Sequence, residues 1–112
     1  MSGITTHVLD TSLGRPASGV AVHLEREREN QWESVGRAET DAEGRVRTLV
    51  PEGMRVSPGV YRLSFGVREY FQRSDVFTFY PYVQIAFETT ANQHYHVPLL
   101  ISPFGYSKYR GS

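Results

Sequence analysis

The sequence predicts an all-β protein, a sandwich or barrel of about eight short strands with one brief helix. Short segments of alternating apolar and polar residues recur along the chain. Turn-forming Gly, Pro, Asp and Ser separate them at intervals of roughly 8–12 residues. Aromatic residues, which favour strands, make up 12% of the chain. There is no internal repeat, heptad or low-complexity segment to suggest another architecture.

Composition narrows the possible partners. A chain of 112 residues is long enough for one core, so we expect a single domain over residues 1–112. Lys and Arg total 12, as do Asp and Glu, which argues against nucleic acid or an anionic membrane as a partner. The absence of Cys excludes disulfides and thiolate chemistry. Neither a signal peptide nor a membrane-length apolar run is present, so we expect a cytoplasmic protein.

Four strands are expected in the first half of the chain. They cover residues 4–9, 20–25, 31–39 and 45–50. The stretch DTSLGRPASG is a connection, and Val20, Val22 and Leu24 then alternate with other residues at the period of a half-buried strand. The charge run EREREN indicates a solvated strand end and hairpin loop. TDAEGR is a turn in which Gly44 can take a positive φ, and Pro51 stops the strand that follows.

The second half supplies the helix and four more strands. The strands cover residues 60–67, 82–88, 92–100 and 106–112. In VYRLSFGV and YVQIAFE, large apolar residues alternate with smaller or polar ones, as in strands with one buried face. The stretch REYFQRSD, residues 68–75, lacks this pattern and favours one or two helical turns.

The stretch NQHYHVPLL places His94 and His96 two residues apart, hence on the same face of the expected strand. A metal site, a catalytic pair or coincidence would each explain this. A zinc site normally needs a third protein ligand. With no Cys, the candidates are His7, His23 or a carboxylate, and no spacing selects one of them. For a single histidine, a surface position or a hydrogen-bonded core position is the more common role.

Two further places carry unusual chemistry. Arg45 opens a strand after a tight turn, where its rigid guanidinium suits a planar, anionic or carbonyl-rich ligand, although a solvated arginine fits equally. Arg47 shares its face. The terminal KYRGS crowds an aromatic ring, a cation and a hydroxyl at a chain end, where fraying is usual. If this end is ordered, Ser112 contributes a hydroxyl and the α-carboxylate. No spacing matches a nucleophile elbow, a P-loop or a paired catalytic dyad.

Two long motifs, HVLDTSLGRPASGVAV and YHVPLLISPFGYS, resemble the N- and C-terminal signatures of the transthyretin-like family, and within it the 5-hydroxyisourate hydrolases. Ile101, where Leu is usual, is a conservative departure. The resemblance covers essentially the whole chain. Where the branches differ, this sequence has the hydrolase residue. His7 stands where the transporter has a lysine, Arg45 follows EG, His96 lies in YHVPLL, and the chain ends in YRGS.

The resemblance implies a transthyretin-like (prealbumin-like) sandwich that hydrolyses 5-hydroxyisourate to 2-oxo-4-hydroxy-4-carboxy-5-ureidoimidazoline in urate degradation. It implies a small-molecule substrate, no metal, no organic cofactor, and a homotetramer with active sites between two dimers. The implied catalytic residues are His7, Arg45, His96 and Ser112, and the implied substrate-binding residues are Arg45, Tyr109 and Ser112.

We expect His7 and His96 to hold and deprotonate water, while Arg45 binds the substrate's oxygens. Tyr109 and Ser112 would complete the pocket, with Arg110 and Gly111 setting the tail's position. Three alternatives stay open at this point: a non-enzymatic small-ligand transport protein, a metal-dependent hydrolase built on His94 and His96, and a structural or adhesive sandwich. No role follows for His23, His94 or Arg47.

Overall fold

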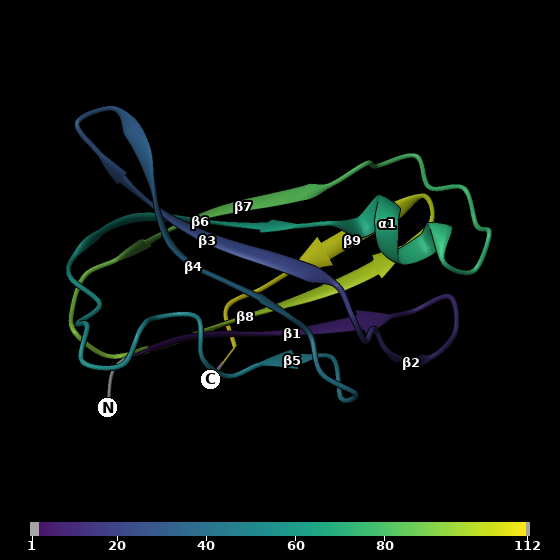
Figure 1. Ribbon diagram of the computed structural model, residues 1–112, viewed down its shortest axis with the longest axis horizontal. Coiled ribbons are helices and arrows are strands. Elements are labelled where there is room, and N and C mark those ends of the chain that lie inside the picture. Colours follow the sequence, from purple (N-terminus) through teal and green to yellow (C-terminus); the bar gives the residue numbers. More distant parts are fainter. Residues whose placement is uncertain (1–2, 112) are drawn as a thin grey trace.

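Two sheets packed face to face form the protein, whose computed structural model describes residues 3–111 (Figure 1). Sheet A has the order β2-β1-β8-β9, with β5 also paired to β1. Its strands are β1 (Gly3–Asp10), β2 (Arg15–Pro16), β5 (Arg45–Val46), β8 (His94–Ser102) and β9 (Gly105–Lys108). Sheet B has the order β4-β3-β6-β7. Its strands are β3 (Ala21–Arg28), β4 (Gln31–Glu39), β6 (Gly59–Phe65) and β7 (Val83–Thr89). The expected all-β class is confirmed, as a sandwich.

The two ends of the chain meet in sheet A. Strands β1 and β8 pair in parallel over eight residue pairs, from Gly3 with His94 to Asp10 with Ile101. Every other strand pair within residues 3–111 is antiparallel. This pairing puts Thr5 opposite His96 and joins segments about ninety positions apart in the sequence.

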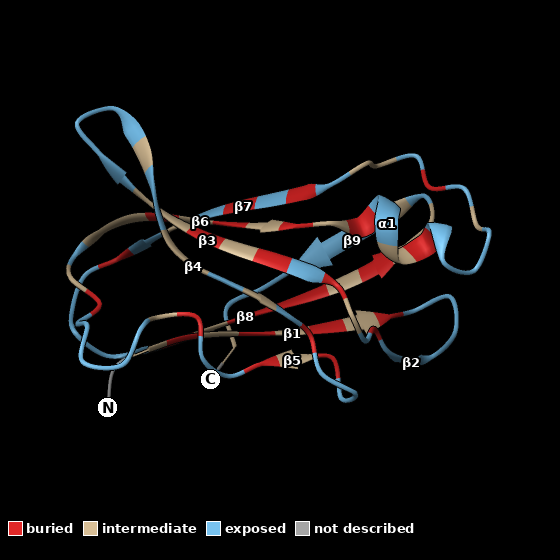
Figure 2. Cartoon of the chain, viewed as in Figure 1, coloured by how far each residue is buried: buried red, intermediate tan, exposed pale blue. Residues whose placement is uncertain are grey.

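The core lies between the sheets, as the alternating buried and exposed bands of Figure 2 show. Every second residue of β1 is buried, as the period-2 pattern predicted. The same holds for the expected apolar faces of β3, β6 and β8. The largest fully buried side chains are Phe65, Ile4, Leu24, Leu63, Leu99 and Ile101. The opposite face of each sheet is therefore free to carry polar side chains.

The helix α1 (Val67–Gln72) lies at one end of the sandwich (Figure 1). Val67 and Phe71, one turn apart, are its buried residues. The Tyr70 hydroxyl donates a 2.7 Å hydrogen bond to the carboxylate of Asp10, a residue that is 1% exposed. Burial, followed by this bond, raises the pKa of Tyr70 to about 12. The phenol therefore stays a donor and ties the helix to the end of β1.

Several expected boundaries were wrong. The strand expected over 45–50 ends at Val46, because the chain leaves β1 there and buries Leu49 against β4, with its carbonyl over Gly36. Val67 begins α1 instead of ending β6, so the helix starts earlier than expected. The strand expected over 106–112 ends at Lys108. The connection expected over 10–19 contains the short strand β2. No helix within residues 3–111 has the length and apolar character needed to cross a bilayer.

The turn before β5 depends on Gly44. Its φ is +76°, and its carbonyl accepts a 2.7 Å hydrogen bond from the backbone N–H of Val8. A Cβ at this position would collide with the Val8 carbonyl oxygen and lie 3.1 Å from Pro16 Cβ. Gly53 has a similar φ of +85°, but nothing lies within 4 Å of a Cβ placed there. A side chain at either glycine would be strained by the positive φ, but only a side chain at Gly44 would also collide with neighbouring atoms.

We predict that Gly44→Ala lowers the free energy of unfolding by about 1–3 kcal/mol more than Gly53→Ala, because only the first adds a collision with β1. Gly53→Ala should cost about 1–2 kcal/mol, from its positive φ alone. Urea unfolding followed by circular dichroism measures both. Equal losses for the two variants would show that the β5 turn tolerates displacement from β1.

Candidate active site

Three neighbouring strands of sheet A present the predicted residues on its outer face. His7 of β1 pairs with Arg45 of β5 on one side, and Thr5 of β1 pairs with His96 of β8 on the other. All four residues are half-buried, and the residues between them along each strand point into the core. The structure thus brings together His7, Arg45 and His96, which lie far apart in the sequence.

An open depression of about 370 Å³ lies on this face. It is lined by Thr5, Thr6, Arg45, Val46, Arg47, His94 and His96. His7 stands beside it on β1, next to Arg45. The lining combines two cations, two imidazoles and two hydroxyls, and no carboxylate from residues 3–111 takes part. Such a surface suits a polar ligand that is rich in carbonyl or anionic oxygens.

The turn 41–44 leads directly into Arg45, and its hydrogen bonds involve the backbone of Arg45 and not its side chain. One carboxylate oxygen of Asp41 accepts the backbone N–H groups of Glu43 (2.8 Å) and Arg45 (3.0 Å). The bond from Arg45 is the main cause of the lowered pKa of Asp41. Within residues 3–111, the Arg45 guanidinium makes no hydrogen bond or ion pair. Its donors therefore remain available to a ligand.

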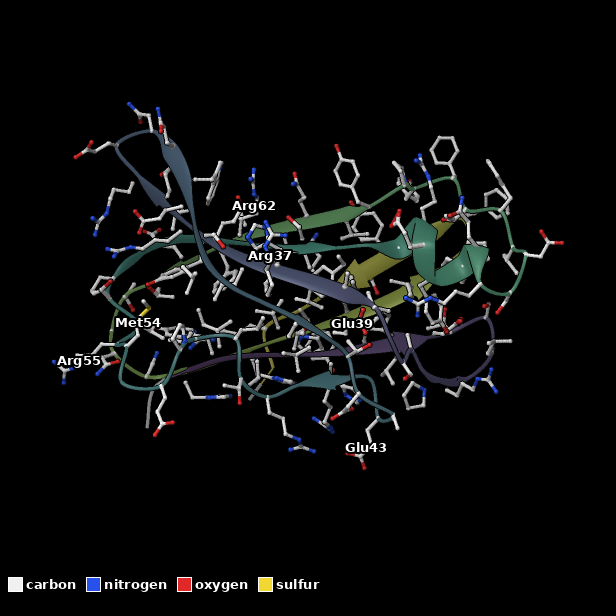
Figure 3. The ribbon with its side chains drawn as sticks, viewed as in Figure 1. Arg37, Glu39, Glu43, Met54, Arg55 and Arg62 are labelled. Atoms are coloured by element: carbon white, nitrogen blue, oxygen red, sulfur yellow. The ribbon has the colours of Figure 1, made fainter. Side chains whose placement is uncertain are left out.

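Arg47 differs from Arg45 in this respect. Its guanidinium lies 3.2 Å from the carboxylate of Glu43, and both side chains are about two-thirds exposed. Figure 3 shows Glu43 at the outer end of the turn, pointing away from the sandwich. An exposed pair of this kind contributes little to stability, but it gives Arg47 a partner that Arg45 lacks.

His7 has a defined hydrogen-bonding state. Its Nε2 lies 2.9 Å from the backbone carbonyl oxygen of Glu43. A carbonyl only accepts, so Nε2 carries the proton and Nδ1 carries the lone pair in the neutral ring. The same turn that presents Arg45 therefore orients His7 as a base at Nδ1.

His96 is held from the side of its Nδ1, which lies 2.8 Å from the Thr5 hydroxyl oxygen. Its Nε2 has no hydrogen-bond partner in the part of the chain that the structure describes. Burial lowers the pKa of His96, and the charges of Arg45, His94 and His7 lower it further. His96 is consequently neutral near pH 7, with Nε2 left for water or a ligand.

The tail lies against His96 as far as the structure describes it. The backbone N–H of Gly111 donates a 2.8 Å hydrogen bond to the carbonyl of His96. A Cβ on Gly111 would lie 2.6 Å from Cδ2 of the His96 ring. The guanidinium of Arg110 lies 5.2 Å from the centre of the Tyr95 ring, a cation–π contact. Ser112 lies outside the described residues.

Tyr109 borders a different hollow. It is 58% exposed and lines a depression of about 260 Å³ between β7 and the tail, which shares only His96 with the first one. Its role in binding substrate stays a prediction, as does the role of Ser112.

The remaining histidines fall into two situations. His23 lies on sheet B, where its Nε2 is 2.9 Å from the Ser34 hydroxyl, so it has no part in the depression. His94 stands beside His96, and its Nε2 is 3.0 Å from the same Thr5 hydroxyl.

Among residues 3–111, no three His, Asp or Glu side chains gather as metal ligands would. Sequence reasoning missed Thr5, because its place between the two rings follows from the β1–β8 pairing.

We predict that the imidazole of His96 titrates below its ordinary value of 6.5, so it stays neutral to lower pH than an exposed histidine. Removing the second cause of the shift, in Arg45→Gln, should raise the midpoint. Arg47→Gln removes an equal charge two residues away and should leave it unchanged. NMR titration of the imidazole C–H signals measures all three midpoints. A wild-type midpoint at or above 6.5 would contradict this account.

The lowered pKa of His96 also makes the free energy of unfolding depend on pH. Because the pKa of folded His96 is lowered, the free energy of unfolding decreases as the pH falls from about 6.5 through the folded-state pKa, and this residue has no such effect at higher pH.

Comparison with known proteins places this geometry in a family. Residues 4–111 match the HIUase/Transthyretin family. A 5-hydroxyisourate hydrolase from Caulobacter vibrioides is 44% identical over 117 residues, with both chains covered completely. The structure of Klebsiella pneumoniae 5-hydroxyisourate hydrolase superposes with a TM-score of 0.85 at 37% identity, covering 97% of this chain and 98% of the other.

Sea bream transthyretin in complex with thyroxine superposes with a TM-score of 0.90 at 27% identity, covering 96% of this chain and 93% of the other. The expected transthyretin-like sandwich is therefore confirmed. The chain belongs to the HIUase/Transthyretin family.

Proposed function

We propose that this protein is a hydrolase that converts 5-hydroxyisourate to 2-oxo-4-hydroxy-4-carboxy-5-ureidoimidazoline in urate degradation. The observation that carries the proposal is the meeting of His7, Arg45 and His96 on the outer face of sheet A. Relatives named for this activity are similar over nearly the whole chain. The polar depression on that face has the size and chemistry for a small, oxygen-rich ring.

Opening a cyclic amide requires an activated water, stabilisation of the oxyanion and a proton for the leaving nitrogen. Within residues 3–111, the Nε2 of His96 and the Nδ1 of His7 make no hydrogen bond, and these two nitrogens would hold and deprotonate water. Arg45 remains protonated and offers paired donors to the carbonyl oxygens, where negative charge develops during attack. A histidine that has accepted the proton can then deliver it to the leaving nitrogen.

The fold itself does not separate an enzyme from a carrier, since it superposes on a thyroxine-bound transthyretin as well as on a hydrolase. The side chains that line the depression favour an enzyme over a carrier. A guanidinium that makes no ion pair within residues 3–111, beside imidazoles, suits catalysis on a polar substrate, whereas an apolar lining would suit a hydrophobic ligand.

The proposal includes assembly into a homotetramer in which depressions of this kind meet between dimers. Two features support association. Strands β7 and β9 are unpaired edges of the two sheets in the single chain. Phe77, Phe79 and Phe104 are each at least 65% exposed at the end of the sandwich that carries the β8–β9 turn. The cytoplasmic location stays a prediction.

The test is ultraviolet absorbance during urate oxidation, with and without this protein, after its tetrameric mass has been confirmed by light scattering. Urate oxidase generates 5-hydroxyisourate in place, and its decay should quicken in proportion to added protein. His96→Ala should reduce the catalysed rate about 10²-fold or more, because a positioned base is lost. Arg45→Lys keeps the charge and loses the planar fork, so its rate should also fall.

His23→Ala, on the other sheet, is the matched control and should retain the full rate. Decay at the spontaneous rate with folded tetramer would reject the enzyme and make small-ligand transport the leading function. A small loss in His96→Ala would reduce His96 to a packing residue.

For the tail, we predict that Gly111→Ala lowers turnover at least about tenfold without unfolding the protein. The added methyl would occupy the space of the His96 ring and force the ring and tail apart. Gly105→Ala is the control, since a Cβ there would meet only the Ser102 hydroxyl at an ordinary 3.6 Å. Deleting residues 109–112 should abolish turnover. Full activity in both tail variants would show that residues 109–112 have no part in the site.

A further inference from the structure

The Thr5 side chain lies between two imidazoles. Its hydroxyl oxygen is 2.8 Å from Nδ1 of His96 and 3.0 Å from Nε2 of His94, both within hydrogen-bond distance. The parallel pairing of β1 and β8 fixes this arrangement, because it places Thr5 opposite His96 and Gly3 opposite His94. All three side chains line the depression described above.

The single hydrogen of the Thr5 hydroxyl links the tautomers of His94 and His96. A threonine hydroxyl has one hydrogen and two lone pairs, so it can donate to only one of the two rings, and a ring that does not receive this hydrogen must itself donate to the hydroxyl. If Thr5 donates to His94, then His96 carries its proton on Nδ1 and its lone pair on Nε2. If Thr5 donates to His96, then His96 carries its proton on Nε2 and cannot accept one there. An unprotonated Nε2 on His94 that accepts this hydrogen therefore leaves His96 in the tautomer that can act as a base.

The surroundings favour the first arrangement. His94 is exposed, so its Nδ1–H can bond to water while its Nε2 accepts from Thr5. Arg45 lines the same depression, and its charge acts on His96. A positive charge there favours a lone pair over an N–H group on the ring nitrogen that is left for the ligand.

We propose that Thr5 and His94 are positioning residues that hold His96 in the Nδ1–H tautomer, with the Nε2 lone pair toward the depression. The inference deepens the proposed function and rests on it. When His96 takes a proton from water at Nε2, its Nδ1–H still donates to Thr5, so the imidazolium keeps the same partner. The two histidines separated by one residue thus have different roles: His96 reacts, and His94 sets its tautomer through Thr5.

The experiment combines nitrogen-15 NMR of the imidazoles with turnover. Wild-type His96 should show a protonated Nδ1 and an unprotonated Nε2. Thr5→Val removes the hydroxyl at nearly constant shape, and His94→Phe removes the acceptor while keeping Thr5. Both should move the His96 proton to Nε2 and lower kcat about tenfold or more. Thr5→Ser keeps the hydroxyl and should retain the wild-type tautomer and most of kcat.

His23→Phe is the matched control, since His23 lies on the other sheet, and it should change neither readout. The proposal is overturned if wild-type His96 carries its proton on Nε2, or if Thr5→Val and His94→Phe leave its tautomer unchanged. It is also overturned if the tautomer moves while kcat stays the same. Failure of the wild-type protein to accelerate decay of 5-hydroxyisourate rejects the proposed function instead, and the NMR result then stands by itself.

Discussion

The parallel pairing of β1 with β8 is the constraint on which the rest of the molecule depends. It joins the first and last long strands, and it puts Thr5 beside His96 and His7 beside Pro98. A shift of one residue would turn the inward side chains of either strand outward, so burial of Ile4, Val8 and Leu99 fixes the register. The same register fixes the outer face. The hydrophobic core therefore determines which polar groups meet in the depression on the outer face.

The charges on that face depend on the turn 41–44, in which the two acidic residues have different hydrogen-bond partners. Glu43 pairs with Arg47, and its backbone carbonyl orients His7. Oδ1 of Asp41 accepts two backbone N–H groups, and within residues 3–111 neither carboxylate forms an ion pair with Arg45. As far as residues 3–111 show, Arg45 is an unpaired cation near an imidazole whose pKa is already lowered by burial. The result is an imidazole close to a permanent positive charge, a combination that suits the proposed hydrolysis of a cyclic amide.

Proteins named for different functions share this fold. The same two sheets superpose on a thyroxine-bound transthyretin and on a hydrolase. The difference in function therefore has to come from side chains and not from the fold. A rigid sandwich suits this purpose because its core sets strand positions, while outward residues change with little effect on packing. The Gly111 backbone N–H donates to the carbonyl of His96, and this glycine leaves no room for a Cβ beside the His96 ring.

The sequence by itself determined the local features of this protein. Period-2 alternation predicted the inward faces of β1, β3, β6 and β8, because alternation is a property of neighbouring residues. Motif resemblance predicted the family, along with His7, Arg45 and His96 as site residues. Tertiary structure alone decided what depends on strand partners. It ended the strand after Val46, and it placed Thr5 between two histidines some ninety residues away. A side chain's register partner lies elsewhere in the chain, so the residues around Thr5 held no signal of its place in the site.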